Sequence, residues 1–346
     1  MERSKGPHAP TIRGVAERAG VSKSLVSLVL QGSPRVSDAK RQAVLEAIEE
    51  LGYRPNAAAR SLVARRTHTV GVLLDDLRNP WFVELLDGLN SVLCAHGLRM
   101  LMADSRLGRR TGEDVARTFL ELRVDGVVAV GTLPDADTAA LAELAERLPT
   151  VVAGSHDPRL PGVDTVANDD ERGARLATEH LIGLGHRRIA HIAGPGGVGE
   201  LRRRGYETTM REHGLGGELT VEPGDGTEEG GYRAAVRMLG GRPAAAPERP
   251  TAVFAFNDFS AVGALSAARE LGLEVPRDLS LVGCDNTYLA RIRHLWLTTV
   301  DNASHDVGRR AAQRLLDRME HPARPAGHGL AAPSLEVRGS TAPPPG

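Results

Sequence analysis

Three polar residues, Ser22, Lys23 and Ser24, follow the turn residue Gly20 and begin a helical pattern near the N-terminus. A lysine there can donate to guanine O6 and N7, and serine hydroxyls can bond to bases or phosphate oxygens. Residues 1–66 contain 12 Lys+Arg and 6 Asp+Glu, whereas the rest of the chain contains 31 and 38. A basic segment on an acidic body favours contact with a polyanion such as DNA. The alternative is a solvated helix start on a basic arm.

A second group of polar residues lies where short apolar runs end. Asp258 ends "TAVFAFND", Asp285 lies near the end of "LSLVGCDN", and Ser155 ends "PTVVAGS". Ligands of parallel sheets bind beyond the carboxyl ends of the strands, where a carboxylate can accept hydrogen bonds from hydroxyl or amino groups. These residues are therefore candidates for a ligand site. For Asp258 the alternative is that it caps a helix that begins at Phe259.

Motifs for catalysis and cofactors are weak in this chain. The run "GPGGVG" (194–199) fits G-x-G-x-x-G, and Glu222 follows roughly 20 residues later, as in a dinucleotide site. Pro195 stiffens this turn and a basic run follows it, so nucleotide binding is only a minor alternative. The consecutive letters "SHD" (155–157) cannot converge as a catalytic triad. His191, inside an apolar run, is expected in the core. We expect no enzyme activity and no cofactor.

Composition narrows the class of protein further. Hydrophobic residues make up 41% of the chain, as in an ordinary globular protein, and aromatic residues only 3%, too few for a wide stacking platform for single-stranded nucleic acid. Cys94 and Cys284 lie far apart, which predicts neither a disulfide framework nor a metal site. No apolar run approaches the roughly 18 residues that span a membrane, and no signal-peptide core is present. We expect a cytoplasmic protein.

The N-terminal residues must position the polar group around Lys23, and their periodicity predicts three short helices over 12–19, 22–31 and 38–51. Thr11, Ser22 and Ser37 are the candidate N-caps. Apolar residues at helical spacing give each helix one buried face, formed by Ile12, Val15, Ala16 and Ala19 in the first, Val26, Val29 and Leu30 in the second, and Val44, Leu45, Ile48 and Leu51 in the third. A tight turn between the first two helices indicates a helix-turn-helix domain.

From residue 69 onward, short apolar runs alternate with helix-sized segments in two series. This alternation predicts an α/β core of parallel sheets covered by helices, folded into two lobes whose strand ends face a cleft. We expect a helix-turn-helix domain over 1–54, a hinge over 55–68 and the core over 69–346. Within the core we expect one lobe from about 69–165 and 297–322, and the other from about 166–296 and 323–341.

At this point the sequence resembles a family of bacterial transcription regulators, the lactose, galactose and purine repressor family. The resemblance runs in family order from about residue 11 to about 340 and is carried by "TIRGVAERAGVS", "RVSDAKRQAVLEAIEELGYRPNAAARSL", "TVGVLLDDLRNPWF", "HLIGLGHRRIAHIAG", "RRRGY", "NDFSAVGALSAARELGLEVPRDLSLVGCDN" and "LTTV". It implies a dimer in which each subunit has a DNA-binding head, a hinge helix and a periplasmic-binding-protein-like core.

The resemblance implies that residues 22–31 form the recognition helix in the major groove, with Lys23 and Ser24 at base edges. Leu62 aligns with an apolar wedge that enters the minor groove at the operator centre. Leu28 stands where many members have a polar residue, so it either touches a thymine methyl or packs inward. The expected DNA-contacting set is Thr11, Ser22, Lys23, Ser24, Ser27, Leu28, Arg35, Asn56, Arg60 and Leu62, with further charge from Arg13 and Lys40.

For the core, the resemblance places Asn79 and one of the rings of Trp81 and Phe82 against the ligand, after the first strand. It assigns a ligand-contacting arginine to Arg202, although the neighbouring "RR" leaves a slip of one residue open. The expected effector-binding set is Asn79, Trp81, Phe82, Ser155, Arg202, Asp258 and Asp285. Acceptors with one planar donor fork favour a sugar or sugar derivative, and a nucleobase is second.

We therefore expect a ligand-responsive transcription regulator, most consistent with a repressor, that binds a pseudo-palindromic operator as a homodimer; a tetramer is also open. Its partners are double-stranded DNA and a small molecule, without a membrane, and its place is the bacterial cytoplasm at the nucleoid. Whether the ligand acts as inducer or corepressor is open, and departures at Leu28 and Gln31 leave the operator sequence open. The alternative is a sugar-binding protein without a regulatory role.

Overall fold

The computed structural model describes residues 10–30, 33–53, 66–112, 115–155, 160–240 and 249–345, without the side chain of residue 116. The chain divides into two compact units, residues 1–67 and 68–346. Each unit has its own hydrophobic core. Within the described ranges, no helix combines the length and apolar character needed to cross a lipid bilayer.

The first unit contains three helices around a small core. They are α1 (Ile12–Arg18), α2 (Lys23–Leu30) and α3 (Asp38–Glu50). Two of the predicted caps form: the Thr11 hydroxyl accepts from the Gly14 amide at 3.1 Å, and the Ser22 hydroxyl accepts from the Leu25 amide at 3.2 Å. Ser37 precedes α3 without a side-chain cap bond. The core consists of Val15, Ala16, Val26, Val29, Val36, Val44 and Ala47.

The predicted buried face of the third helix is partly wrong. Val44 and Ala47 point into the core, whereas Leu45 is 47% exposed and Leu51 is 37% exposed. A unit of three short helices covers only a narrow stripe of each helix, because so small a domain has a high ratio of surface to volume. The periodicity therefore indicated the helix correctly but made its buried stripe too wide.

The second unit begins with a six-stranded sheet in the order β11-β5-β4-β3-β1-β2, in which all neighbours are parallel. Its strands are β1 (Thr69–Leu74), β2 (Arg99–Asp104), β3 (Gly126–Val130), β4 (Thr150–Ala153), β5 (Asp164–Asn168) and β11 (His328–Ala331). One face is covered by α5 (Trp81–Ala95) and α13 (Ser304–Glu320), the other by α7 (Val115–Glu121) and α8 (Asp135–Ala145), and α6 (Ser105–Thr111) follows β2.

The other lobe repeats this plan in the order β12-β10-β9-β8-β6-β7, with only β12 antiparallel. Its strands are β6 (Ile189–Ala193), β7 (Thr220–Pro223), β8 (Ala252–Ala255), β9 (Ser280–Cys284), β10 (Thr298–Asp301) and β12 (Ser334–Glu336). Its helices are α9 (Asp170–Gly183) and α10 (Gly196–Glu212) on one face and α11 (Glu228–Leu239) and α12 (Asp258–Glu270) on the other, with short 3-10 turns η1 (Gly216–Glu218) and η2 (Tyr288–Arg291).

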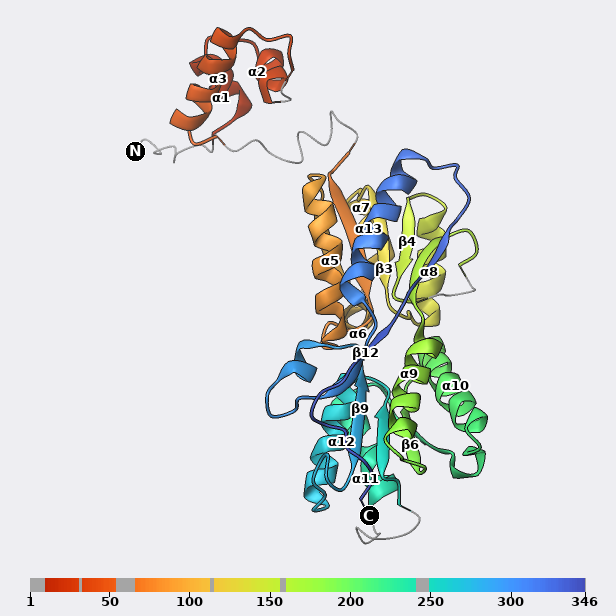
Figure 1. Cartoon of the computed structure of the whole chain (residues 1–346). Helices are drawn as coiled ribbons and strands as arrows, with labels where there is room; N and C mark the ends of the chain where they lie inside the picture. The colour runs from red at the N-terminus through yellow and green to blue at the C-terminus, as the bar shows by residue number, and fades with distance from the viewer. Residues whose placement is uncertain are drawn as a thin grey trace. The chain divides into compact units, whose positions relative to one another are not determined.

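Three chain segments cross between the lobes, from β5 to α9, from β10 to α13 and from β11 to β12 (Figure 1). These crossings correct the predicted lobe limits. Residues 298–301 belong to the second lobe rather than the first, residues 328–331 belong to the first rather than the second, and β5 carries the first lobe to Asn168. The strands β5 and β11 were not predicted. Their pairing joins Thr165 to His328, a contact far too distant in sequence for local periodicity to indicate.

Glycines allow α5 and α13 to pack closely over the first sheet. A Cβ atom on Gly88 would lie 2.0 Å from the His305 carbonyl oxygen, and one on Gly308 would lie 2.0 Å from the Leu85 oxygen. A backbone atom cannot rotate away as a side chain can, so any larger residue must push the two helices apart. Gly183 in α9, by contrast, has nothing within 4 Å of an added Cβ.

We expect Gly88→Ala to destabilise the core by about 2–3 kcal/mol through overpacking. The matched variant Gly183→Ala should be neutral or stabilise by up to about 1 kcal/mol, because alanine favours the helix and restricts the unfolded chain. Urea unfolding followed by circular dichroism measures both. Equal stabilities of the two variants would contradict the close packing of α5 on α13.

Candidate functional site

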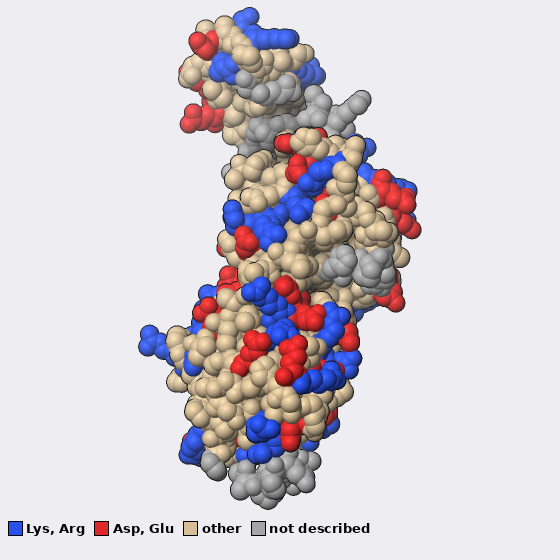
Figure 2. Space-filling model, turned by 45° about the vertical axis from the view of Figure 1, so that its right-hand side comes forward, with Lys and Arg blue, Asp and Glu red and all other residues tan. Residues whose placement is uncertain are grey.

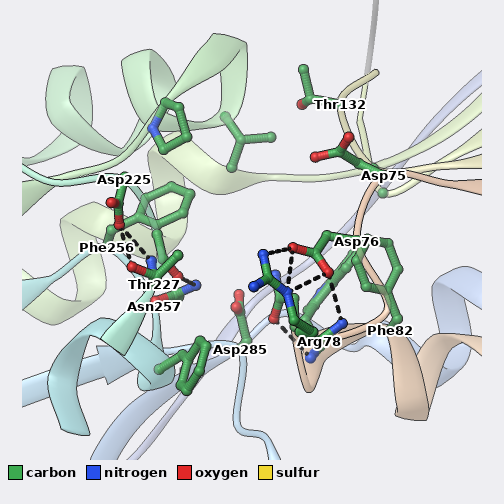
Figure 3. Close-up of a pocket in the computed structure, with 18 of the residues that line it drawn as sticks. Asp75, Asp76, Arg78, Phe82, Thr132, Asp225, Thr227, Phe256, Asn257 and Asp285 are labelled. Carbon is green, nitrogen blue, oxygen red and sulfur yellow. Dashed lines mark hydrogen bonds and ion pairs between the residues drawn. The ribbon is translucent and has the colours of Figure 1, made fainter. Parts of the chain in front are cut away.

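A cavity of about 380 Å³ lies between the carboxyl ends of the strands of the two lobes. The first lobe contributes residues at the ends of β1, β3, β4 and β5, and the second contributes those after β6, β7, β8 and β9. Figure 3 shows their side chains around an open centre. Five of the seven residues expected to bind the effector line this cavity: Asn79, Trp81, Phe82, Arg202 and Asp285. The strand-end rule therefore located the cleft.

The wall from the first lobe is the start of α5. The Asn79 side-chain oxygen accepts from the Trp81 amide at 3.1 Å and so holds the turn that leads into the helix. The rings of Trp81 and Phe82 contact each other edge to face, with centroids 5.1 Å apart, and both are largely buried. Trp81 packs directly on Gly154, where a Cβ would approach its ring to 2.2 Å. Both rings line the cavity, so either of them can contact a ligand there.

Arg202 forms the base of the second lobe's wall and is only 4% exposed. Its Nε donates to Asp170 Oδ1 and its Nη2 to Asp285 Oδ1, both at 2.9 Å, and its Nη1 donates to the Phe256 carbonyl at 2.5 Å. The guanidinium also lies 4.8 Å from the centroid of the Phe256 ring. Two carboxylates thus neutralise a buried cation, as burial requires. The next two residues in the chain, Arg203 and Arg204, pair with glutamates at the surface, so Arg202 is the residue at the cleft.

Asp285 links the cleft to the crossing segments. Its Oδ1 accepts from Arg202 and also from Asn302 Nδ2 at 2.8 Å, and its backbone has a positive φ of 102°. The backbone carbonyl of Asn302 accepts in turn from Asn168 Nδ2 at 2.6 Å. Asn168 ends β5 and Asn302 follows β10, so both lie on segments that connect the lobes. A ligand that contacts Asp285 therefore contacts the same network that joins the lobes.

Asp258 does not lie at the cavity, and the prediction that it binds the effector is wrong on this geometry. It is fully buried and accepts from the Thr287 amide at 2.7 Å, the Thr287 hydroxyl at 2.9 Å and the Thr299 hydroxyl at 2.5 Å. The alternative role as a helix cap is also wrong, because the Asn257 side chain caps α12 through the Ser260 amide. Asp258 instead ties the loop after β9 to β10.

Ser155 lies beside the cleft rather than in it. Its hydroxyl donates to the Gly131 carbonyl at 2.6 Å, and it lines a neighbouring, more apolar cavity of about 470 Å³. Ser155 therefore supports the turn after β4.

Several cleft residues were not singled out from the sequence, although the strand-end rule that indicated Asp285 also applies to them. They follow β1, β3, β7 and β8 and are Asp75, Asp76, Arg78, Thr132, Asp225, Thr227, Phe256 and Asn257. The Arg78 guanidinium donates hydrogen bonds to both carboxylate oxygens of Asp76 and lowers the pKa of that carboxyl to about 2. Asp75 and Asp76 precede "NPWF" with only two intervening residues, at the same strand end.

The glycine-rich run 194–199 serves packing. A Cβ on Gly194 would lie 2.2 Å from the Phe256 ring, and one on Gly199 would lie 2.0 Å from the Gly194 carbonyl. The glycines therefore let the protein's own ring and backbone approach each other. His191, on the neighbouring strand, stacks 4.9 Å from Phe254, and its burial lowers its pKa to about 4, so it is a neutral core residue as predicted.

In the first unit, the outer face of α2 carries the predicted base-reading residues. Lys23 and Ser24 are exposed, Ser27 is half-buried, and Leu28 is 38% exposed, which removes the alternative that Leu28 packs inward. Thr11 and Ser22 are exposed and cap their helices, and Arg35 is exposed in the loop before α3. The remaining expected DNA contacts, Asn56, Arg60 and Leu62, lie outside the described residues.

Comparisons with known proteins agree with this geometry. Residues 11–56 match the family described as bacterial regulatory proteins, lacI family, and residues 178–341 match a periplasmic binding protein-like domain. The chain is 37% identical over 314 residues to the HTH-type transcriptional repressor PurR of Erwinia tasmaniensis, covering 89% of this chain and 90% of that one.

Two solved structures extend the comparison. The lac repressor dimer bound to operator and the anti-inducer ONPF is 28% identical with a TM-score of 0.84, and the match covers 96% of this chain and 99% of that one. The complex of the transcriptional regulator CelR with cellobiose is 30% identical with a TM-score of 0.67, over 96% and 99% of the two chains. The similarity therefore spans both the helical unit and the two-lobed core.

The buried carboxyl of Asp258 should make the free energy of unfolding depend on pH. Burial, together with the nearby Asp285 charge, raises the pKa of Asp258 to about 7 from 3.8. The folded state therefore holds this proton more tightly than the unfolded state, so the stabilisation is complete below about pH 4 and is lost as the pH rises through 7. The variant Asp258→Asn keeps the shape of the side chain but cannot titrate. Between about pH 4 and pH 8 we expect its free energy of unfolding to fall by about 2–4 kcal/mol less than that of the wild type.

The measurement is urea unfolding of the wild type and Asp258→Asn at a series of pH values from about 4 to 8. The difference between the two curves isolates Asp258, because carboxyls whose pKa is lowered, such as Asp76, contribute equally to both. A difference that does not change with pH would show that Asp258 does not titrate in this range.

Proposed function

Because this chain belongs to the lacI family of bacterial regulatory proteins and is therefore a DNA-binding transcription regulator and not an enzyme, we propose that it represses transcription as a dimer on a pseudo-palindromic operator and that a small molecule in the cleft switches this binding. The observation that carries the proposal is the combination in one chain of an exposed polar face on α2 and a cleft between two lobes.

On the DNA side, α2 enters the major groove with Lys23 and Ser24 at base edges. Lys23 donates to guanine acceptors, and the exposed Leu28 contacts a thymine methyl, which an apolar side chain can recognise. Thr11, Ser22, Ser27 and Arg35 contact the backbone and fix the register without reading sequence. From residues outside the described ranges, Asn56 and Arg60 add contacts and Leu62 enters the minor groove as a wedge.

On the ligand side, a sugar fits the cleft best. Carboxylates accept from sugar hydroxyls, and Asn257, Thr227 and Thr132 offer amide and hydroxyl groups along the wall. The rings of Trp81, Phe82, Phe256 and Phe259 can cover the apolar face of a sugar ring. The solved structure of CelR with cellobiose supports this class of ligand. A nucleobase is the second candidate, because the same rings could stack on a planar heterocycle.

The switch is a difference in ligand affinity between two arrangements of the lobes. A ligand that contacts Asp285 and Arg202 acts on the hydrogen bonds that continue to Asn302 and Asn168 on the crossing segments. Linkage makes the effect reciprocal, so operator binding changes ligand affinity by the same factor as the ligand changes operator affinity. The corresponding coupling free energy is typically 1–3 kcal/mol. Operator titration with and without ligand determines whether the molecule is an inducer or a corepressor.

The site of action is the bacterial cytoplasm, where the operator lies in the nucleoid. A dimer matches the two half-sites of a pseudo-palindrome, since the symmetry of the protein mirrors that of the DNA. The dimer of the solved lac repressor structure supports this assembly. Analytical ultracentrifugation distinguishes a dimer from a tetramer. The alternative, a sugar-binding protein without a regulatory role, does not account for the exposed polar face of α2.

We expect Lys23→Ala to weaken binding to the protein's own promoter by about 10- to 100-fold and to relax discrimination against a scrambled duplex, because a base contact is lost. The comparison variant is Lys40→Ala on α3, whose exposed charge should act on phosphates only. It should weaken binding to both duplexes alike and reduce the slope of log affinity against log salt by about one. Fluorescence anisotropy across a salt series measures both. An equal loss on both duplexes for Lys23→Ala would contradict base reading.

Separate folding of the two units allows a further test. We expect residues 68–346 alone to unfold cooperatively and to keep their response to sugars, because both sheets and the cleft lie within this unit. The truncated protein should not bind the promoter. Thermal unfolding with a panel of sugars and a gel-shift titration provide the two measurements. Promoter binding by the truncated protein would overturn the division of labour between the units.

A further inference from the structure

The wall of the cleft has an excess of negative charge. Six carboxylates line the cavity, from Asp75, Asp76, Asp225, Glu228, Glu229 and Asp285, against two guanidinium groups, from Arg78 and Arg202. Figure 3 shows Asp75, Asp225 and Asp285 on different sides of the open centre. Both lobes contribute to the excess, because Asp75 follows β1 and Glu228 begins α11. A ligand that enters this cleft meets carboxylates on opposite walls.

Both arginines of the cleft are already paired with carboxylates. Arg78 binds both oxygens of Asp76, with Nε distances of 2.9 and 3.0 Å. Arg202 already has Asp170 and Asp285 as ion-pair partners at 2.9 Å. Arg78 is largely exposed, and its partner Asp76 also pairs with Arg106. At the buried Arg202, however, a phosphate or carboxylate would have to displace one of the two partners and leave that carboxylate without its cation. Such a loss is costly in a partly desolvated site.

Several of the carboxylates keep oxygens for a ligand. Glu228 is half-buried and forms no hydrogen bond or ion pair within the described parts of the chain. Asp285 uses Oδ1 for both of its partners, which leaves Oδ2 to the cavity. Asp75 has one partner, the partly exposed Arg109 at 3.0 Å from Oδ1. The rings of Phe256 and Trp81 add the negative faces that attract cations.

One feature of the cleft acts in the opposite direction. Helix α10 begins at Gly196 with no acidic residue in its first turn, so its N-terminus presents a partial positive charge beside Pro195 and Val198. This charge amounts to about half an elementary charge. It is smaller than the excess of four carboxylates over guanidiniums among the residues that line the cavity. Arg106, Arg109 and Arg233, which lie outside the lining, pair with Asp76, Asp75 and Asp225 and offset part of this excess. Glu228 and the Oδ2 atom of Asp285 have no cation partner among the described residues, and this remaining negative charge favours a positively charged ligand group.

We propose that the effector carries no anionic group and that, among polyhydroxylated ligands built on one scaffold, the ammonium-bearing member binds most tightly and the phosphorylated member least. Asp75 and Glu228, from opposite lobes, are the residues that set this preference. The ammonium group also reduces repulsion between the two acidic walls when the lobes close on it. The inference rests on the proposed function only in taking this cleft as the effector site.

Isothermal titration of the full-length protein tests the order directly. The probes are D-glucosamine, D-glucose and D-glucose 6-phosphate, with the corresponding galactose series, at about pH 6.5 so that the amine is protonated. We expect the amino sugar of at least one series to bind about tenfold more tightly than the neutral sugar. The phosphorylated sugar should not bind at about 10 mM. Higher salt should reduce the advantage of the amine.

The variant pair isolates the charges. Asp75→Asn with Glu228→Gln should remove most of the tenfold difference between amino and neutral sugar. Glu143→Gln with Glu218→Gln removes one exposed charge from each lobe outside the cavity and should keep the difference. Circular dichroism establishes that both double variants are folded, and each single substitution serves if a pair is not.

Three results would overturn the proposal: a phosphorylated sugar that binds as tightly as its neutral partner, an amine advantage that persists in the variant of Asp75 and Glu228, or no binding by any amino or neutral sugar of either series. Promoter binding by the same samples separates this failure from that of the proposed function. Protein that binds its promoter but prefers the phosphorylated sugar refutes only the charge preference.

Discussion

A buried guanidinium between two carboxylates is the constraint on which the core depends. Arg202 is 4% exposed, and it can remain charged there only because Asp170 and Asp285 lie within 2.9 Å on either side. Asp170 begins α9, Arg202 lies in α10, and Asp285 follows β9, so the ion pairs fix three elements relative to one another. Removing one partner would leave an uncompensated charge, which makes such triads costly to break. The base of the second lobe's wall is therefore held together by buried ion pairs.

The same triad connects the cleft with the segments between the lobes. Asn302 donates to Asp285 and accepts, through its backbone, from Asn168, while its side-chain oxygen is buried without a partner in the described part of the chain. The next residue, Ala303, has a positive φ of 54°, an uncommon conformation for alanine. Asn302 thus joins Asp285 at the cleft to the segments that cross between the lobes.

Local sequence patterns predicted the helices and strands better than they predicted the contacts that these elements make in the fold. The alternation of apolar runs indicated two α/β lobes, but it did not indicate β5 and β11, which pair with each other across a long stretch of chain. Strand ends indicated the cleft, and Asp258 and Asp285 both follow a strand. Asp285 nevertheless lines the cavity, whereas Asp258 is fully buried away from it. The difference comes from Thr287 and Thr299, which surround Asp258 after the chain has folded, whereas Asp285 faces the cavity. No local rule separates the two aspartates.

In the helical unit, pairing of charges decides where the positive potential lies. Arg13 pairs with Glu17 at 3.0 Å, Arg18 pairs with Glu50, and Arg41 donates to the Ser33 carbonyl at 2.6 Å. Lys23, Arg35 and Lys40 form no ion pair within the described residues of this unit. Because surface pairs screen each other, the unpaired cations dominate the field that a phosphate backbone meets. Lys23 also projects from the face of α2 that carries Ser24 and Leu28. Basic and acidic side chains both lie at the surface of this unit (Figure 2), so the pairing of charges decides where unpaired positive charge remains.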